Sequence, residues 1–260
     1  PKQINLYTAL NWNLPDFAHV PMILGGDGAR LSKRHGAVNV MAYRDQGFLP
    51  KALLNYIVRL GWSHGDQEVF SLEEMIDLFD LDNINKAPAS FNQEKLIWLN
   101  QSYIKSTEIS ELIQHLQWHL ERRSIDVNCG PSIEDVVESL RDRSKTLVEM
   151  ADSCVMFYQD FAAFDEKQAS KQFSNKSQPV IKALHSKLSA LDVWNAETVH
   201  GAIQEVCEQE GVGFGKVGQP FRLALSGDGK AGSIDVCAEL VGKNRTLSRL
   251  QMSVDYIKAL

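Results

Sequence analysis

Cysteine is scarce in this sequence, with four residues among 260, and no two of them form a C-x-x-C pair. A chain of this length buries a core large enough to fold without covalent links, so dispersed cysteines indicate neither a disulfide framework nor a zinc knuckle. We therefore expect a reducing compartment and interpret the cysteines as small buried hydrophobic side chains. They are Cys129, Cys154, Cys207 and Cys237.

Long apolar runs are also absent. No stretch reaches the roughly 18 residues that a membrane-spanning helix needs, and the chain does not open with the basic and then apolar segments of a secretory signal. With 44% hydrophobic and 23% charged residues, the composition is that of a globular protein rather than a disordered or fibrous one. We expect a cytoplasmic protein that does not use a membrane as a partner.

The chain has a formal net charge of -6 and a pI near 5.7, which argues against a protein that coats nucleic acid through bulk positive charge. The sign is uneven along the chain. Residues 1–60 contain seven Lys and Arg but only three Asp and no Glu, whereas residues 68–82 are rich in acids. Contact with a polyanion is therefore expected on selected faces only.

Apolar residues recur at three- and four-residue spacing along most of the chain after residue 50, which predicts a mainly α fold. Pro50 suits the first position of one helix, and Gly61 suits its end. Further helices are predicted near residues 180–188, 196–209 and 220–225 and at the C-terminus. No internal repeat and no set of alternating strands accompanies them.

Several helix starts are marked by a serine followed three residues later by a suitable partner. The predicted pairs are Ser71 with Glu74, Ser90 with Gln93, and Ser132 with Asp135. The polar segment 165–178 is the preferred internal boundary. In the last predicted helix, one apolar face is formed by Leu247, Leu250, Val254 and Ile257.

Residues 25–37, GGDGARLSKRHGA, place glycines on both sides of a dense cationic centre. Glycine lets a loop approach a ligand or move, and Lys33 and Arg34 can donate to phosphate oxygens, so this composition suits a mobile phosphate clamp. A solvated basic turn is the alternative, and residue spacing alone leaves both open. Residues 211–216, GVGFGK, match neither of the common phosphate-loop patterns.

Arg30, Leu31, Ser32, Lys33 and Arg34 form a motif that resembles the Lys-Met-Ser-Lys-Ser signature of class I aminoacyl-tRNA synthetases. Arginine in the last position, followed by His-Gly, is typical of glutamyl-tRNA synthetase. Similarity to the bacterial family extends over essentially the whole chain. The other motifs that carry it are residues 17–21, 43–44, 47–50, 60–62, 91–92, 98–100, 215–217, 220–222 and 242–243.

The resemblance implies a glutamate-tRNA ligase. Such an enzyme joins ATP and L-glutamate into a glutamyl-adenylate with release of pyrophosphate, and then transfers the glutamyl group to the tRNA for glutamate. It implies that Lys33 stabilises the negative charge that develops on the phosphates, with Ser32 and Arg34 assisting. Arg30, Leu31 and Lys33 are the expected ATP contacts, with Mg2+ accompanying ATP. Arg30 stands where the family usually has lysine, which changes the donor geometry.

The resemblance also implies the organisation of the chain. Residues 1–40 are expected to end the catalytic domain, and residues 41–105 to form a helical stem-contact region. Residues 106–168 and 169–260 are expected to be two helical subdomains of an all-helical anticodon-binding domain.

Anticodon bases are read by stacking and by hydrogen bonds to their edges, for which the planar guanidinium serves well. By their place in the family motifs, Arg143 and Arg222 are the expected anticodon readers, together with Ser233 and Ile234 in a nearby loop. Gly232 stands in that loop where the family usually carries proline. The alternative for either arginine is a surface helix charge beside a carboxylate.

The nucleotide-binding fold with its His-Ile-Gly-His motif is expected upstream of residue 1. We therefore expect this chain to be a C-terminal portion that binds no cofactor alone, is inactive in adenylation by itself, and belongs to a monomeric enzyme. A standalone tRNA-binding adaptor without catalysis is one alternative. Glutaminyl-tRNA synthetase is another, although that relative reads its anticodon with β-barrels.

Other conspicuous side chains have simpler interpretations. His115 and His119 lie four apart on a predicted helix, but no third ligand is nearby, so we expect surface histidines and no metal site. Trp62 and Trp98 lie among apolar helix residues and are expected in the core.

Overall fold

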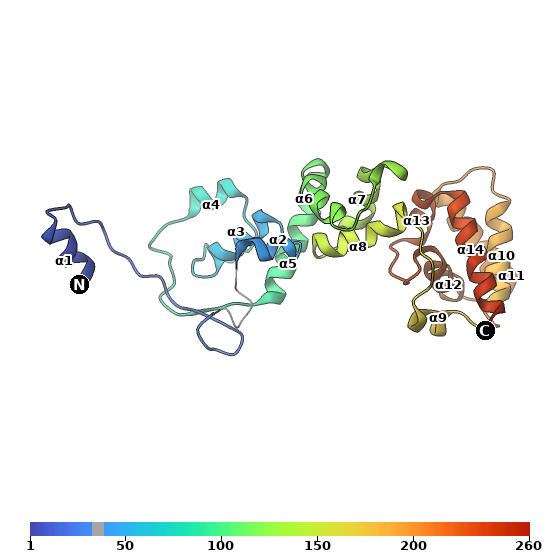
Figure 1. The fold of residues 1–260 in the computed structure, drawn as a ribbon, viewed down its shortest axis with the longest axis horizontal. Coiled ribbons are helices and arrows are strands. Elements are labelled where there is room, and N and C mark those ends of the chain that lie inside the picture. The colour runs from blue at the N-terminus through green and yellow to red at the C-terminus, as the bar shows by residue number, and fades with distance from the viewer. Residues whose placement is uncertain (33–38) are drawn as a thin grey trace. The chain divides into compact units, whose positions relative to one another are not determined.

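The computed structural model describes residues 1–32 and 39–260, and helices dominate them, as predicted (Figure 1). The elements in chain order are α1 (Lys2–Ala9), β1 (Ile23–Leu24), α2 (Val40–Asp45), α3 (Pro50–Arg59), α4 (Leu72–Leu78), β2 (Ala89–Ser90), α5 (Gln93–Ser106), α6 (Ile109–Glu121), the 3-10 helix η2 (Val127–Cys129), α7 (Ile133–Arg141), α8 (Leu147–Tyr158), α9 (Glu166–Gln172), α10 (Gln178–Ser189), α11 (Ala196–Glu210), α12 (Phe214–Ser226), α13 (Ile234–Val241) and α14 (Lys243–Lys258).

The chain forms two compact units. Unit 1 comprises residues 1–39 and 51–96, and unit 2 comprises residues 40–50 and 97–260. The four domain ranges expected from the sequence remain predictions; the expected boundaries at 40/41, 105/106 and 168/169 fall within α2, α5 and α9. In the described part of the chain, no helix is both long enough and apolar enough to cross a bilayer.

Unit 1 has a small core of Trp62, Phe70 and Met75. The predicted capping box at the start of α4 is confirmed: the Ser71 side chain accepts from the Glu74 backbone N–H, and the Glu74 carboxylate accepts from the Ser71 backbone N–H. These hydrogen bonds satisfy two backbone groups that the helix end would otherwise leave open. They fix where α4 begins beside the core.

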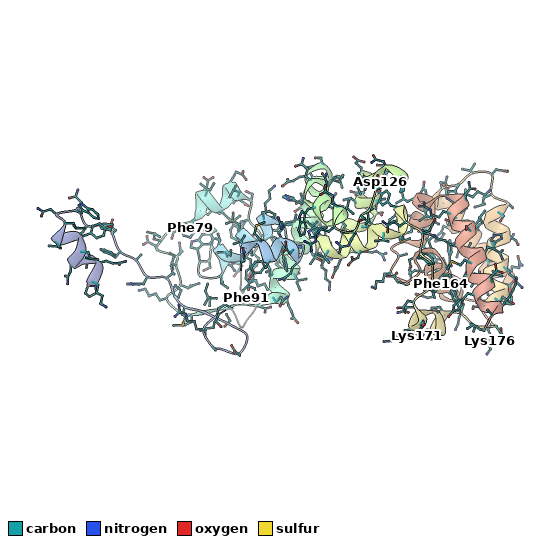
Figure 2. The ribbon with its side chains drawn as sticks, viewed as in Figure 1. Phe79, Phe91, Asp126, Phe164, Lys171 and Lys176 are labelled. Carbon is teal, nitrogen blue, oxygen red and sulfur yellow. The ribbon has the colours of Figure 1, made fainter. Side chains whose placement is uncertain are left out.

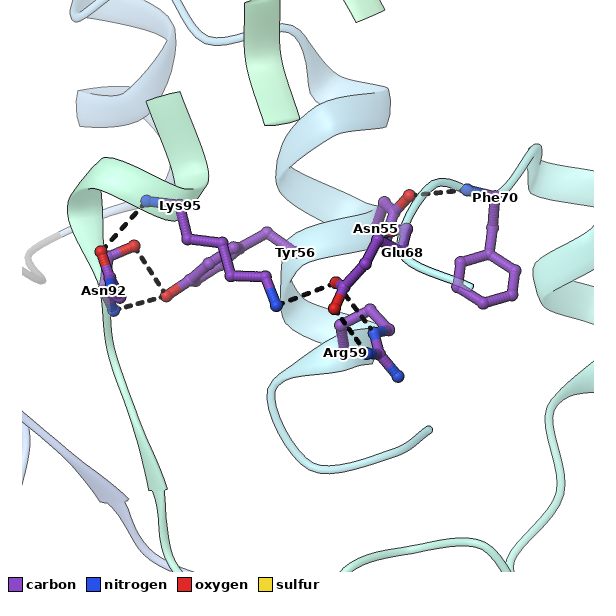
Figure 3. A network of polar contacts seen from close by, with 7 residues as sticks. All are labelled: Asn55, Tyr56, Arg59, Glu68, Phe70, Asn92 and Lys95. Carbon is purple, nitrogen blue, oxygen red and sulfur yellow. Dashed lines mark hydrogen bonds and ion pairs between the residues drawn. The ribbon is translucent and has the colours of Figure 1, made fainter. Parts of the chain in front are cut away.

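A polar network joins α3 to the segment that precedes α4 (Figure 3). Asn55 is fully buried; its side-chain amide donates to the Glu68 carbonyl oxygen at 3.1 Å, and its side-chain oxygen accepts from the Phe70 N–H at 2.8 Å. The Glu68 carboxylate forms ion pairs with Arg59 at 3.0 Å and with Lys95 at 2.8 Å. Partial burial raises the pKa of Glu68, but its bonds to these two cations leave that pKa below its usual value.

The start of α5 differs from the prediction. Asn92, not Ser90, caps this helix, because the Asn92 side-chain oxygen accepts from the Lys95 N–H at 3.0 Å. Ser90 is held instead in β2, which pairs in parallel with β1 through Leu24. The Tyr56 hydroxyl, which donates to the Asn92 carbonyl and accepts from the Asn92 N–H, holds the capping residue in place (Figure 3). Strand pairing therefore moved the helix start two residues along the chain.

Unit 2 contains two groups of packed helices. In the first, α6 packs against α7 and α8, and in the second, α10 packs against α11 and α14 while α12 packs against α11 and α14 (Figure 1). The predicted cap at Ser132 and the predicted end of α11 at Gly211 are confirmed; Gly211 has φ 64°, a conformation that favours glycine. In α14, the predicted residues Leu250, Val254 and Ile257 are buried.

The segment around Phe164 joins α9 to the second helix group (Figure 2). The Phe164 ring makes edge contacts with the rings of Phe161, Phe173 and Tyr256 at centroid distances of 5.3, 5.0 and 5.5 Å. Aromatic pairs at these distances stabilise beyond their buried area. The polar segment predicted as a boundary is therefore partly helical, and anchored aromatic side chains, Phe164 and Phe173, flank its helix α9.

Helix α12 is longer than predicted and contains Pro220 in its interior. Proline in a predicted helix favours a start at that residue, but buried Val217 and Phe221 on either side of it pack in the core. This burial extends the helix back to Phe214. Tertiary packing here outweighs the local preference of proline.

Several predicted burial states were wrong. Trp98 is 47% exposed because it lies on the opposite face of α5 from buried Leu96 and Leu99. His119 is 2% exposed rather than a surface residue. Of the four cysteines, Cys154 and Cys237 are buried as expected, whereas Cys129 is exposed and Cys207 is half-buried.

Candidate nucleotide loop and anticodon groove

The glycine-rich sequence that precedes the cationic motif forms a tight hairpin in unit 1. Gly25 N–H donates to the Ala29 carbonyl at 2.8 Å, Gly28 N–H donates to the Gly25 carbonyl at 3.0 Å, and Leu31 N–H donates to the Ile23 carbonyl at 2.8 Å. Gly28 has φ 75°, which an L side chain rarely adopts. The turn therefore needs glycine at this position, and its second arm leads directly into the motif.

The hairpin is anchored on β2. Phe91 N–H donates to the Leu24 carbonyl at 2.8 Å, and Ala89 N–H donates to the Met22 carbonyl at 3.2 Å. The first residue of the motif, Arg30, is exposed opposite Leu24. The chain thus presents the start of the motif from a hydrogen-bonded base rather than from an open loop.

The structure places three of the five motif residues. Arg30 is exposed, and Leu31 and Ser32 are half-buried. Lys33 and Arg34, on which the predicted phosphate chemistry depends, lie outside the described residues.

Unit 2 contains a groove of about 710 Å³, here called the α8/α12 groove. One side is formed by the end of α7, by α8 and by the segment that follows α8. The other is formed by the loop between α12 and α13. The lining residues that matter below are Arg143, Gln159, Phe161, Gly227, Lys230 and Gly232.

Arg143 lies just beyond the end of α7 and is exposed at the groove. Among the described residues, its guanidinium has no hydrogen-bond or ion-pair partner. Its donors are available to a ligand.

Arg222, on α12, is half-buried and reaches the same loop. Its Nη2 donates to the Gly232 carbonyl at 3.3 Å, and its Nε is buried without a partner in the described part of the chain. A Cβ at Gly232 would lie 3.6 Å from the Cys237 sulfur, so the loop passes close to α13. Arg222 therefore shapes the loop from within.

The two remaining predicted anticodon residues are adjacent but differ in accessibility. Ser233 is the exposed N-cap residue of α13, whereas Ile234 is 3% exposed and packs near Gly218 of α12. Ile234 therefore offers almost no surface to a ligand.

The positive charges of Arg143 and Arg222 both act on the buried thiol of Cys237. Burial raises the pKa of Cys237 to about 11, while the positive charges of these two arginines act in the opposite direction. Both guanidinium groups thus lie within electrostatic reach of one buried thiol. The high pKa makes Cys237 unreactive as a nucleophile.

Sequence reasoning missed the acidic character of this groove. Four carboxylates line it, and each has a protein partner: they are Glu149, Asp152, Asp165 and Asp228. Carboxylates repel phosphates but accept hydrogen bonds from base amino groups. No sequence motif predicts these carboxylates, because they come from three separate segments. The arrangement suits bases better than a sugar-phosphate backbone.

A metal site is not formed by the described residues. Within residues 1–32 and 39–260, no group of three His, Cys, Asp or Glu side chains could hold a metal ion. His119, one of the two histidines considered, is a buried residue of α6 and packs edge-on against Trp118 at a centroid distance of 4.8 Å.

Two family models match the chain in sequence order. Residues 1–98 match the catalytic domain of the class I tRNA synthetases for glutamate and glutamine, and residues 111–254 match an anticodon-binding domain. A part of a catalytic domain followed by a helical anticodon-binding domain defines the class I aminoacyl-tRNA synthetases of this type.

Similar proteins make the assignment more specific. Glutamate-tRNA ligase of Ruthia magnifica subsp. Calyptogena magnifica is 60% identical over 255 residues, and that of Vesicomyosocius okutanii subsp. Calyptogena okutanii (strain HA) is 59% identical over 256 residues. The chain belongs to the bacterial glutamyl-tRNA synthetase family. The match covers 98% of this chain but 56% of each relative, so the chain spans little more than half of their length.

Solved structures agree with this assignment. A glutamate tRNA ligase from Elizabethkingia meningosepticum CCUG26117, crystallised in complex with its amino acid, has a TM-score of 0.81 at 30% identity. Glutamate-tRNA synthetase from Elizabethkingia anophelis has a TM-score of 0.78 at 29% identity. In both cases the match covers 98% of this chain and 54% of the other. The C-terminal residues that the structure describes are helical. This disfavours glutaminyl-tRNA synthetase, because that relative is expected to read its anticodon with β-barrels.

Proposed function

We propose that this chain is the part of a glutamate-tRNA ligase that reads the tRNA anticodon and supplies the mobile ATP loop. The whole enzyme would attach L-glutamate to the tRNA for glutamate through a glutamyl-adenylate, at the expense of ATP. The observation that supports this most is that Arg143 lines the α8/α12 groove, while Arg222, predicted from a separate motif 79 positions away, donates to the carbonyl of Gly232, which lines the same groove.

In the proposed adenylation step, the ATP loop stabilises negative charge. Attack of the glutamate carboxylate on the α-phosphorus forms the adenylate and breaks the bond to pyrophosphate, so charge grows on the phosphate oxygens. Lys33 would stabilise that charge, with Ser32 and Arg34 assisting. The hairpin that ends at Leu31 supports this proposal, because it delivers the following residues from a base fixed on β2.

ATP, L-glutamate and the tRNA are the proposed partners of the whole enzyme. Mg2+ would enter with ATP; since the described residues form no carboxylate cluster that fits a metal, we derive no step through it. A monomeric cytoplasmic enzyme without a membrane partner completes the proposal.

In the proposed anticodon step, single-stranded bases enter the α8/α12 groove. Arg143 offers free donors at the rim, while Arg222 and the exposed Ser233 present the loop between α12 and α13. Ile234, which is 3% exposed, would support the loop rather than meet the bases. A guanidinium can both stack on a base and donate to its edge, which is how single-stranded RNA is commonly read.

Binding measurements test the anticodon proposal. Arg143→Ala and Arg222→Ala should reduce the preference for the cognate glutamate tRNA over a tRNA with altered anticodon bases, because each good base contact discriminates by about 1–3 kcal/mol. Lys182→Ala, which removes an exposed cation of α10 outside the groove, is the matched control and should keep the preference. Equal affinities of the wild-type chain for cognate and altered tRNA at several salt concentrations would contradict the proposal.

Pyrophosphate exchange tests the catalytic half. Lys33→Ala in the complete ligase should lower the glutamate-dependent exchange rate by about 10²-fold or more, as expected for loss of an oxyanion donor. The 260-residue chain alone should show no exchange. Exchange by that chain alone, or a dispensable Lys33 in the complete enzyme, would refute this part.

A further inference from the structure

Arg249 of α14 is a buried arginine that connects two separate segments of unit 2. Only 5% of its side chain is exposed. Its Nη1 donates to the Leu225 carbonyl oxygen at 2.6 Å, and its Nη2 donates to the Gln159 carbonyl oxygen at 2.8 Å. Leu225 lies in the last turn of α12, and Gln159 directly follows α8. One guanidinium therefore joins the ends of the two helices that lead into the α8/α12 groove.

A second arginine reinforces this connection one helical turn earlier. Arg245 Nη1 donates to the Phe157 carbonyl oxygen at 2.7 Å. The exposed carboxylate of Asp160 lies 3.2 Å from Arg245 Nε and 3.1 Å from Arg249 Nη2. Positive charge at the C-terminal end of α8 is also favourable for the helix dipole. We call Arg245, Arg249 and Asp160 the arginine clamp.

The segments that the clamp holds are themselves walls of the groove. Gln159 and Phe161 line it after α8, and Gly227 lines it after α12. The guanidinium carbon of Arg249 lies 5.2 Å from the centre of the Phe161 ring. That ring packs so closely on Gly227 that a Cβ there would lie 2.9 Å from it. The two walls are therefore in close contact at Phe161 and Gly227, with no room for a further side chain between them.

We propose that Arg249 is a positioning residue for anticodon recognition: with Arg245 and Asp160 it fixes the distance between the wall that carries Arg143 and the wall formed by the loop between α12 and α13, which Arg222 holds through the Gly232 carbonyl. The proposal rests on the proposed anticodon-binding function and names the residues that set the geometry of that site. Arg249 does not itself touch the RNA.

The choice of arginine supports a geometric role. Burying a guanidinium costs solvation, and replacing a buried ion pair with apolar residues is often neutral or stabilising, so stability alone is a weak reason for this residue. The planar fork of arginine can reach the carbonyl oxygens of Leu225 and Gln159 at the same time. Lysine keeps the charge but is a point donor on a flexible stem, so it cannot hold both in a fixed geometry.

Two variants carry the test. Arg249→Lys keeps the buried charge, and Asp160→Asn removes a carboxylate that is 70% exposed, so the second remains informative if the first fails to fold. Asp255→Asn is the matched control, because it removes an exposed carboxylate of α14 that pairs with Lys258 and lies outside the groove.

The first measurement does not involve RNA. Spin labels at Glu138→Cys on α7 and Glu208→Cys on α11, in a Cys129→Ser, Cys207→Ser background, report the distance distribution between the two helix groups. We expect a narrow distribution in the wild-type background and in Asp255→Asn, and a broader one in Asp160→Asn and Arg249→Lys. Unchanged distributions in both clamp variants would overturn the proposal.

The second measurement is the ratio of dissociation constants for anticodon-altered and cognate glutamate tRNA. One well-formed base contact corresponds to a ratio of about tenfold, and we expect the clamp variants to lose at least one such contact while their helical circular dichroism stays at the wild-type level. A wild-type chain that discriminates, with clamp variants that discriminate equally, refutes only the clamp. A wild-type chain without discrimination refutes the proposed function as well.

Discussion

Asn100 is the side chain whose removal should most clearly destabilise unit 2. It is fully buried on α5, and its side-chain oxygen accepts from the Leu49 N–H at 2.8 Å. Its side-chain amide donates to the Lys145 carbonyl at 2.7 Å and to the Gly47 carbonyl at 3.3 Å. One amide therefore connects α5 with the segment before α3 and with the start of α8.

The cost of Asn100→Ala can be divided among these partners. The Leu49 N–H would be left buried without an acceptor, at about 1–3 kcal/mol. The Gly47 carbonyl would keep its bond from the Leu147 N–H at 2.9 Å, and the Lys145 carbonyl belongs to an exposed residue that water can reach. Because both carbonyls keep another partner or reach water, losing these two bonds adds only about 0.5 kcal/mol each. We expect a total of about 2–4 kcal/mol.

Thermal unfolding followed by circular dichroism measures this effect. For a unit of this size, a loss of 1 kcal/mol lowers Tm by about 2–4 °C, so Asn100→Ala should lower Tm by roughly 5–15 °C. Asn128→Ala is the control, because within the described residues its side chain bonds only to Asp126 in an exposed turn, and it should change stability by less than about 0.5 kcal/mol. Equal Tm values for the two variants would refute this reasoning.

Three further predictions concern stability. Gly47→Ala should destabilise by about 2 kcal/mol or more in denaturant unfolding, because its φ of 85° disfavours a side chain and a Cβ would lie 2.5 Å from the Val148 nitrogen. A neutral effect would contradict this close contact between Gly47 and Val148. Burial, together with the charges of neighbouring arginines, lowers the pKa of His119 to about 4. The free energy of unfolding should therefore fall as the pH drops from about 6.5 toward 4, by up to about 1.4 kcal/mol per pH unit. His119→Phe should remove that part of the pH dependence. Ser71→Ala should cost about 0.5–2 kcal/mol in the unfolding of unit 1, whereas no change would show that its bond to the Glu74 N–H is unimportant.

Where sequence reasoning about local structure failed, a tertiary contact overrode a local signal. Ser90 has the spacing of a cap, but strand pairing with β1 holds it and leaves Asn92 to begin α5. His119 was predicted on the surface, although it lies seven residues after Leu112 and three after Leu116, both buried on the same face of α6. Its helical period already contained the signal for burial, which its polar side chain obscured.

For the candidate site, too, the sequence predicted some residues and only the structure revealed others. The residue types and motifs singled out Arg143, Arg222 and the cationic loop, but no pattern in the sequence predicted the carboxylates that share the groove with Arg143. Those acids become neighbours only through helix packing. Lys33 and Arg34 remain predictions, since they lie outside the described residues.

The sequence by itself determined the helices, several of their caps and the family, because these depend on residues a few positions apart or on contiguous motifs. Only the tertiary structure decided which side chains face one another in the groove and how its walls are held. Arg249 meets the carbonyl of Gln159 across 90 positions of the chain. Such a contact leaves no periodic trace in the sequence, because it depends on how whole helices pack rather than on the spacing of residues along one of them.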